Sequence, residues 1–164
     1  AFRDNWNGSK DTDISVGAYH VLELDTDGTK QAEHFINAVG EDLSGRLIPA
    51  VEVRLRGLYR LLPPDYYEAA DNLADFCDRI EKQYGVRPVI YCTERTYKNI
   101  VASDSRFNKD KIWYESLFSK PDEDMDWTFW TYTNRVKFSF YESGEYLHMT
   151  VFNGSEDDFK KLIL

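Results

Sequence analysis

The sequence predicts an α/β fold in which most strands run parallel. Short runs rich in β-branched residues alternate with longer amphipathic stretches, and turn residues separate them. The expected order is β, α, β, α, β, α, then three strands and a final helix, after a short N-terminal helix. This alternation is typical of parallel strands with helical crossovers. With 164 residues and no internal repeat, residues 1–164 are expected to form a single domain, and either a barrel or an open sheet fits the pattern.

The first part of the chain is expected to supply two strands and two helices. Residues 2–13 carry aromatic side chains at helical spacing and should form a short helix and then a turn. Residues 14–24 are a β-rich run, and a turn signal leads from them into an amphipathic helix over 30–39, which Gly40 should end. Residues 47–55, LIPAVEVRL, then read as a buried strand.

The second part begins with a helix over 66–84. Pro64 and Asp65 are start signals for it, and Gly85 should end it. The elements expected after it are strand 87–93, helix 94–102, strands 111–116, 127–133 and 146–152, and a short helix after Ser155 whose start Asp158 caps reciprocally.

Composition narrows the classes of function. The formal net charge of −9 argues against binding to a nucleic-acid backbone, which requires a basic patch. No run approaches the roughly 18 apolar residues of a membrane span, and we expect no signal peptide in this chain. Cys77 and Cys92 lack metal-ligand spacing and are either buried thiols or one disulfide. Aromatic residues make up 15% of the chain, a level typical of grooves that stack on rings as well as of cores.

Strand 47–55 carries two charges where apolar residues are expected. Glu52 and Arg54 are two residues apart, so both side chains should point to the same face of the strand, while Val51 and Val53 point to the other. Charged side chains are rarely buried unless they are paired. The pattern predicts a Glu–Arg pair near the carboxyl end of a strand, the place where parallel α/β folds build their sites.

The same rule gathers further side chains at one edge of the sheet. The candidates are Tyr19, His20, Glu52, Arg54, Tyr91, Thr93, Trp113, Glu115, Trp130, Tyr132 and His148. Aromatic rings beside carboxylates suit saccharide binding and glycoside hydrolysis. Taken singly, each histidine or tryptophan has a structural alternative in the core. His20, Glu52 and His148 lack the spacing of metal ligands, so we expect neither a metal nor another cofactor.

Several motifs together resemble one known family. They are GAYH at 17–20, QAEHFINAV at 31–39, IPAVEV at 48–53, YGVRPVIYCT at 84–93, IWYES at 112–116, WTFWTYT at 127–133 and HMTVFNGS at 148–155. In this order they resemble glycoside hydrolase family 25, the muramidases that cleave the β-1,4 bond after N-acetylmuramic acid in peptidoglycan. The resemblance implies a modified (β/α) TIM-like barrel, a peptidoglycan or related glycan as ligand, and an extracellular or cell-envelope location.

The chain departs from the family pattern at its acidic centre. The family's Asp-x-Glu becomes Glu52 and Arg54, its Asp-x-Asn becomes His148 to Thr150, and its FWQYT loses the glutamine at Thr131. The family's first two strands, which include an Asp-x-Ser motif, have no counterpart, so the barrel should be incomplete. Glu52 is then the surviving carboxylate at a catalytic position, and Arg54 and His148 occupy substituted acidic positions.

These departures favour a domain whose hydrolytic activity is impaired or lost. An arginine cannot give up a proton near neutral pH, and Arg54 should keep Glu52 ionised. We expect such a domain to bind glycan through the aromatic and polar residues Tyr19, His20, Tyr91, Trp113, Glu115, Trp130 and Tyr132. The alternatives are an active muramidase that uses Glu52 and a non-enzymatic interaction scaffold. An incomplete barrel also exposes sheet edges that a second copy or a partner chain could cover.

Overall fold

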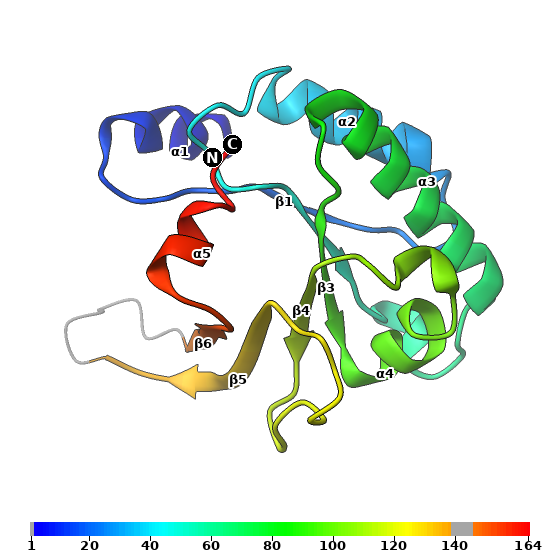
Figure 1. Ribbon diagram of the computed structural model, residues 1–164. Coiled ribbons are helices and arrows are strands. Elements are labelled where there is room, and N and C mark those ends of the chain that lie inside the picture. The colour runs from blue at the N-terminus through cyan, green and yellow to red at the C-terminus, as the bar shows by residue number, and fades with distance from the viewer. Residues whose placement is uncertain (1, 139–145) are drawn as a thin grey trace.

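The computed structural model describes residues 2–138 and 146–164, and its centre is one six-stranded sheet (Figure 1). The strands are β1 (Tyr19–Val21), β2 (Ala50–Val53), β3 (Val89–Thr93), β4 (Ile112–Glu115), β5 (Phe129–Val136) and β6 (Leu147–Phe152). They lie in the sheet in chain order; β1 to β5 are parallel and β6 is antiparallel to β5. The predicted α/β fold with mostly parallel strands is confirmed.

Five α-helices accompany the strands in the described ranges. They are α1 (Phe2–Gly8), α2 (Gly28–Val39), α3 (Tyr66–Tyr84), α4 (Glu94–Thr96) and α5 (Glu156–Lys160). Figure 1 shows α2 and α3 side by side on one side of the sheet and α5 on the other. The helix predicted over 94–102 is α4 followed by a wider, π-helical turn at Tyr97–Val101.

Local sequence signals set the bounds of the long helices. The Asp27 side chain accepts a hydrogen bond from the backbone N–H of Lys30 at the start of α2, and Asp65 caps the start of α3 in the same way. Gly40 and Gly85 follow the two helices with φ of 103° and 74°, a region that favours glycine. The predicted reciprocal cap between Ser155 and Asp158 is also present, at the start of α5.

Strand β1 is shorter than the run predicted at 14–24. Its regular pairing with β2 begins at Tyr19, opposite Ala50. Upstream, Val16 still accepts a backbone hydrogen bond from Leu47, but Ile14 is 71% exposed. β-Branched residues favour extended backbone, whereas a strand also needs a partner along its length, and the paired stretch here is only three residues.

The sheet has two faces with different contents. Val51 and Val53 point toward α2 and α3 and are fully buried, and they share one apolar core with the buried stripes of those helices. Residues 50, 52 and 54 point to the opposite, inner face. The predicted division of strand 47–55 into an apolar face and a charged face is therefore confirmed.

The inner face is apolar near the amino ends of the strands. There Ala50 and Val89 pack in a second core cluster with Leu162 and Phe159 from the C-terminal segment. The backbone of that segment pairs with the chain before β2, where Ile48 donates to the carbonyl of Leu162. Glu52 and Arg54 lie on the same face of the sheet, farther toward the carboxyl end of β2 than this apolar cluster.

The sheet is open in the part of the chain that the structure describes. β1 pairs with β2 alone and β6 with β5 alone, so no pairing joins β6 to β1 across residues 2–138 and 146–164. Within those same ranges, no helix has the length and apolar character needed to cross a membrane.

Candidate functional site

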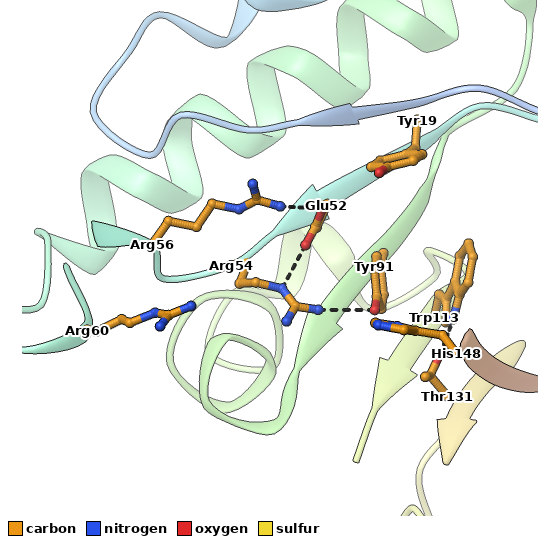
Figure 2. A pocket seen from close by; sticks show the side chains of 9 residues that line it. All are labelled: Tyr19, Glu52, Arg54, Arg56, Arg60, Tyr91, Trp113, Thr131 and His148. Carbon is orange, nitrogen blue, oxygen red and sulfur yellow. Dashed lines mark hydrogen bonds and ion pairs between the residues drawn. The ribbon is translucent and has the colours of Figure 1, made fainter. Parts of the chain in front are cut away.

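A groove of about 590 Å³ opens over the inner face of the sheet toward the carboxyl ends of the strands (Figure 2). Its lining residues are Tyr19, Glu52, Arg54, Arg56, Arg60, Tyr91, Trp113, Thr131 and His148. Six of the residues predicted from sequence meet here, from β1, β2, β3, β4 and β6. Glu115 joins them through its bonds to Arg54 and Tyr91.

Parallel register places the central side chains in one row across the sheet. Glu52 lies opposite Tyr91, and Tyr91 lies opposite Trp113. Thr131 follows on β5, opposite Glu115. Because successive residues of a strand alternate between faces, the residues directly before and after each of these side chains point away from the groove.

One guanidinium bridges two carboxylates, Glu52, which lines the groove, and Glu115. Arg54 donates from Nε to Glu52 Oε1 at 2.7 Å and from Nη2 to Glu115 Oε2 at 2.6 Å. Arg56 donates from Nη2 to the other oxygen, Glu52 Oε2, at 2.9 Å. Glu52 is 5% exposed and Glu115 is 9% exposed. Both oxygens of Glu52 are therefore occupied by cations, and the predicted pair with Arg54 is confirmed.

Tyr91 completes this network. Its hydroxyl donates a short hydrogen bond to Glu115 Oε2 and accepts one from Arg54 Nη2 at 3.1 Å. Burial raises the pKa of Tyr91, and the bond to Glu115 raises it further, so the hydroxyl keeps its proton. Burial alone would lower the pKa of Arg54, but Glu115 reverses the sign and raises it. The network is thus built around a permanently charged guanidinium.

Aromatic rings form the neighbouring part of the groove. Tyr91 and Trp113 stack with ring centroids 4.6 Å apart and planes 29° apart. Trp113 Nε1 donates to Thr131 Oγ1 at 2.8 Å, which fixes the indole, and Thr131 is bonded in turn to Thr150. Tyr19 stands at the edge of the groove with 59% of its surface exposed. The groove therefore offers the rings of Tyr91 and Trp113, which are held in place by their contacts, and the exposed ring of Tyr19.

His20 does not belong to this groove. It follows Tyr19 directly, so its ring points to the opposite face, where it stacks on Phe76 with centroids 5.1 Å apart. Its Nε2 is 3.0 Å from Gln31 Oε1, and burial lowers its pKa. The structure therefore places His20 on the helix-covered face, apart from the groove that was expected to include it.

Trp130 and Tyr132 also lie outside the groove lining. Trp130 packs against the core of the helix-covered face, and its Nε1 donates to the carbonyl of Ser116 at 3.0 Å. Tyr132 lies beside it, with ring centroids 5.7 Å apart, and is 40% exposed. Thr131, between them, is the residue of this run that faces the groove. Alternation along β5 turns both rings away from the groove that was expected to include them.

Three lining residues were not among the predicted ones. Arg56 is two residues beyond Arg54, so its side chain points to the same side of the chain. The alternation that selected Glu52 and Arg54 could therefore have predicted it. The sequence singles out Thr131 only as the position where the motif lacks a glutamine, which does not indicate a place in the groove. Arg60 lies in the 3₁₀ turn Gly57–Arg60, and no strand pattern could have placed it at the groove.

No metal centre is present among the described residues. They contain no group of three or more His, Cys, Asp or Glu side chains close enough to hold an ion. Glu52 and His20 point to opposite faces of the sheet, which separates two of the three candidate ligands. Cys77 and Cys92 are both free and buried, and burial raises the pKa of each thiol. The buried-thiol alternative is confirmed for both cysteines.

Together these features define an α/β protein with a polar and aromatic groove at the carboxyl ends of its parallel strands. The family model of the glycosyl hydrolases family 25 matches residues 1–139. The chain belongs to that family.

Solved structures agree with this assignment. A family 25 glycosyl hydrolase from Bacillus anthracis matches with a TM-score of 0.85 and 30% identity, over 99% of this chain and 75% of that one. A lysozyme from Streptomyces coelicolor has a TM-score of 0.79 and 23% identity, over 98% of this chain and 77% of that one, a likeness that shows the shared fold.

The chain is also similar to an uncharacterized protein of Escherichia coli. The uncharacterized protein YegX of Escherichia coli O157:H7 is 28% identical over 165 aligned residues. The match covers 99% of this chain and 57% of that protein, so the chain spans little more than half the length of this relative.

Proposed function

We propose that this chain is a muramidase-like domain that binds glycan in its groove and has lost, or nearly lost, hydrolysis. The observation that carries the proposal is the engagement of both oxygens of Glu52 by the guanidinium groups of Arg54 and Arg56. A general acid needs a proton on one of those oxygens. A proton there would displace a charge-assisted bond from an arginine.

The chemistry of the reaction sharpens this argument. Glycoside hydrolysis commonly uses two carboxyl groups, one protonated to assist the leaving group and one ionised. Here Glu52 and Glu115 share Arg54, and Glu115 also accepts from Tyr91. Each carboxylate therefore accepts a charge-assisted hydrogen bond from the same guanidinium. Both then serve as ion-pair partners, and the acid role has no occupant among the groove residues.

Two substituted positions of the family pattern reinforce the proposal. Arg54 stands where the family carries a glutamate, and it is the centre of the ion-pair network. His148, on β6, stands at another acidic position and lines the same groove. Both changes remove negative charge from the site.

The rings of the groove support retained binding. Tyr91 and Trp113 form a rigid stacked pair, and Tyr19 presents an exposed ring at the edge. Such rings can pack on the apolar faces of sugars. Similar solved structures are described as a lysozyme and a muramidase. On that basis the ligand we propose is peptidoglycan or a glycan related to it. The domain would then act in the cell envelope or the extracellular space.

Two measurements test the proposal. Incubation with peptidoglycan and with chitooligosaccharides should release no reducing ends above background. Turnover that Glu52→Gln abolishes would show instead an active muramidase that uses Glu52, with the 2-acetamido group of the substrate assisting.

Binding is followed by tryptophan fluorescence during titration with the same oligosaccharides. We expect a saturable change, weakened in Tyr19→Ala and unaffected in Tyr67→Ala, which removes an 87% exposed ring that does not line the groove. No change at millimolar ligand would favour the interaction scaffold.

We also propose that a second copy of the chain, or a partner chain, covers the edges of the sheet. In the described ranges β1 and β6 each have a neighbour on one side only, and unpaired strand edges favour pairing with another chain. Size-exclusion chromatography with light scattering tests this, and a monomer at high micromolar concentration would contradict self-association.

A further inference from the structure

The groove is lined by more positive than negative side chains, whereas the chain as a whole is acidic. The whole chain has a formal net charge of −9. Three arginines, Arg54, Arg56 and Arg60, line the groove, and Glu52 is the one carboxylate among its lining residues. A smaller cavity of about 250 Å³ adjoins the groove, shares Arg54 and Arg60 with it, and adds Arg95. No acidic residue is among those that line this smaller cavity.

Not all of these arginines are neutralised. The charges of Arg54 and Arg56 are balanced by Glu52 and Glu115, with each bond between 2.6 and 2.9 Å. Arg60 and Arg95 make no ion pair with any residue of the described ranges. Glu94, the acidic residue next to Arg95 in the sequence, is paired with Lys98. Two positive charges are therefore left over at one end of the groove.

The two unpaired arginines are held close to each other. Arg95, at the start of α4, donates from Nη1 to the backbone carbonyl of Arg60 at 3.4 Å. The contact joins the 3₁₀ turn after β2 to the turn after β3, across 35 positions of sequence. Both side chains are exposed and line the smaller cavity beside Leu55 and Thr93.

This arrangement suits an anionic group. Guanidinium groups present several N–H donors in a plane and bind carboxylate and phosphate oxygens in a bidentate manner. Two like charges near each other cost free energy, and a bound anion would remove that cost. An arginine-rich cavity in an acidic protein also concentrates anions locally, although the field of the whole chain repels them.

We propose that the groove is selective for an acidic saccharide, a glycan whose carboxylate or phosphate substituent is bound by Arg60 and Arg95 while a sugar ring lies on the Tyr91 and Trp113 side. This inference rests on the proposed glycan binding and adds the chemical class of the ligand. The shared lining residues Arg54 and Arg60 make the two cavities continuous, so one ligand can reach both.

The test compares three tetrasaccharides of equal length by calorimetric titration. One is neutral chitotetraose, one carries free lactyl carboxylates on peptide-free muramic acid, and one is chitotetraose with a phosphate substituent. We expect one or both acidic ligands to bind about tenfold or more tightly than the neutral one, since hydrogen bonds to charged groups are the stronger class. The preference should shrink as salt rises from about 50 to about 500 mM.

Variants assign the selectivity to its residues. The double variant R60Q/R95Q should lose the preference, so that the acidic ligands and chitotetraose bind to it with affinities within about twofold of each other. The matched control R3Q/K30Q also removes two exposed positive charges, but from residues that line neither cavity, and it should behave as the unmodified protein.

The outcomes separate this inference from the proposed function. Equal affinity for all three ligands, or an unchanged preference in R60Q/R95Q, overturns the acidic selectivity and leaves glycan binding in place. Failure of all three ligands to bind overturns both. The comparison of ligands on the unmodified protein decides the matter even if the double variant does not fold.

Discussion

Replacement of Arg54 by methionine tests the network at the centre of the groove. The change removes the cation shared by Glu52 and Glu115, which are 5% and 9% exposed, and with it two bonds of 2.7 and 2.6 Å. Breaking a buried ion pair by removing one partner costs about 3–5 kcal/mol. Because Glu52 keeps its bond to Arg56 and the Arg54 side chain is 25% exposed, we expect about 2–4 kcal/mol.

The matched control is Arg56→Met. It also removes a cation from Glu52, but the Arg56 side chain is 54% exposed, and pairs of that kind contribute about 0–1 kcal/mol. Urea unfolding followed by tryptophan fluorescence and circular dichroism gives both free energies. For a chain of this length, a loss of about 3 kcal/mol corresponds to a fall of about 6–12 °C in the melting temperature.

A further variant tests whether the loss of stability in R54M comes from the unpaired carboxylate of Glu115. Adding Glu115→Gln to R54M replaces an unpaired buried carboxylate by a neutral amide, so part of the lost stability should return. A loss below about 1 kcal/mol in R54M, or an equal loss in Arg56→Met, would refute the view that Arg54 holds the two carboxylates.

Three further changes test the fold. Gly28→Ala should lower the free energy of unfolding by about 1–3 kcal/mol, because the new Cβ would lie 1.8 Å from the backbone oxygen of Asn72. The control Gly8→Ala should leave it unchanged, because a Cβ there meets nothing within 4 Å. Urea unfolding measures both. Stability should fall as pH drops below 6.5, because partial burial lowers the pKa of His20 and the unfolded chain takes up a proton that the folded chain resists. His20→Phe should flatten that part of a pH series. Asp65→Ala should cost about 1 kcal/mol in chemical denaturation through loss of the α3 cap, and no loss would contradict the capping role.

Much of the fold follows from local patterns. The bounds of α2 and α3 agree with their capping residues, and the pairing of Glu52 with Arg54 follows from their spacing on a strand. These features depend on neighbours within a few residues. A single sequence contains that information directly.

Features that depend on distant residues were harder to predict. The rule that sites lie at strand ends selected Tyr19 and His20 together, although adjacent residues of a strand cannot both face one groove. The approach of Arg95 to Arg60 depends on two turns packed together across 35 positions, and no periodicity encodes it. The extent of β1 depends on its partner β2, and its own β-branched residues overstate it.

The position of Arg54 connects stability with the proposed loss of hydrolysis. The resemblance of the motif at 48–53 implies two carboxyl groups at positions 52 and 54 of the family pattern, and like charges in contact favour protonation of one of them, which a general acid requires. A guanidinium at position 54 converts that repulsion into attraction, since Glu52 and Glu115 both pair with it. The same change therefore gives two buried carboxylates a shared ion-pair partner. Under the proposed function, a groove shaped for glycan remains, and its chemistry shifts from proton transfer to the binding of charge.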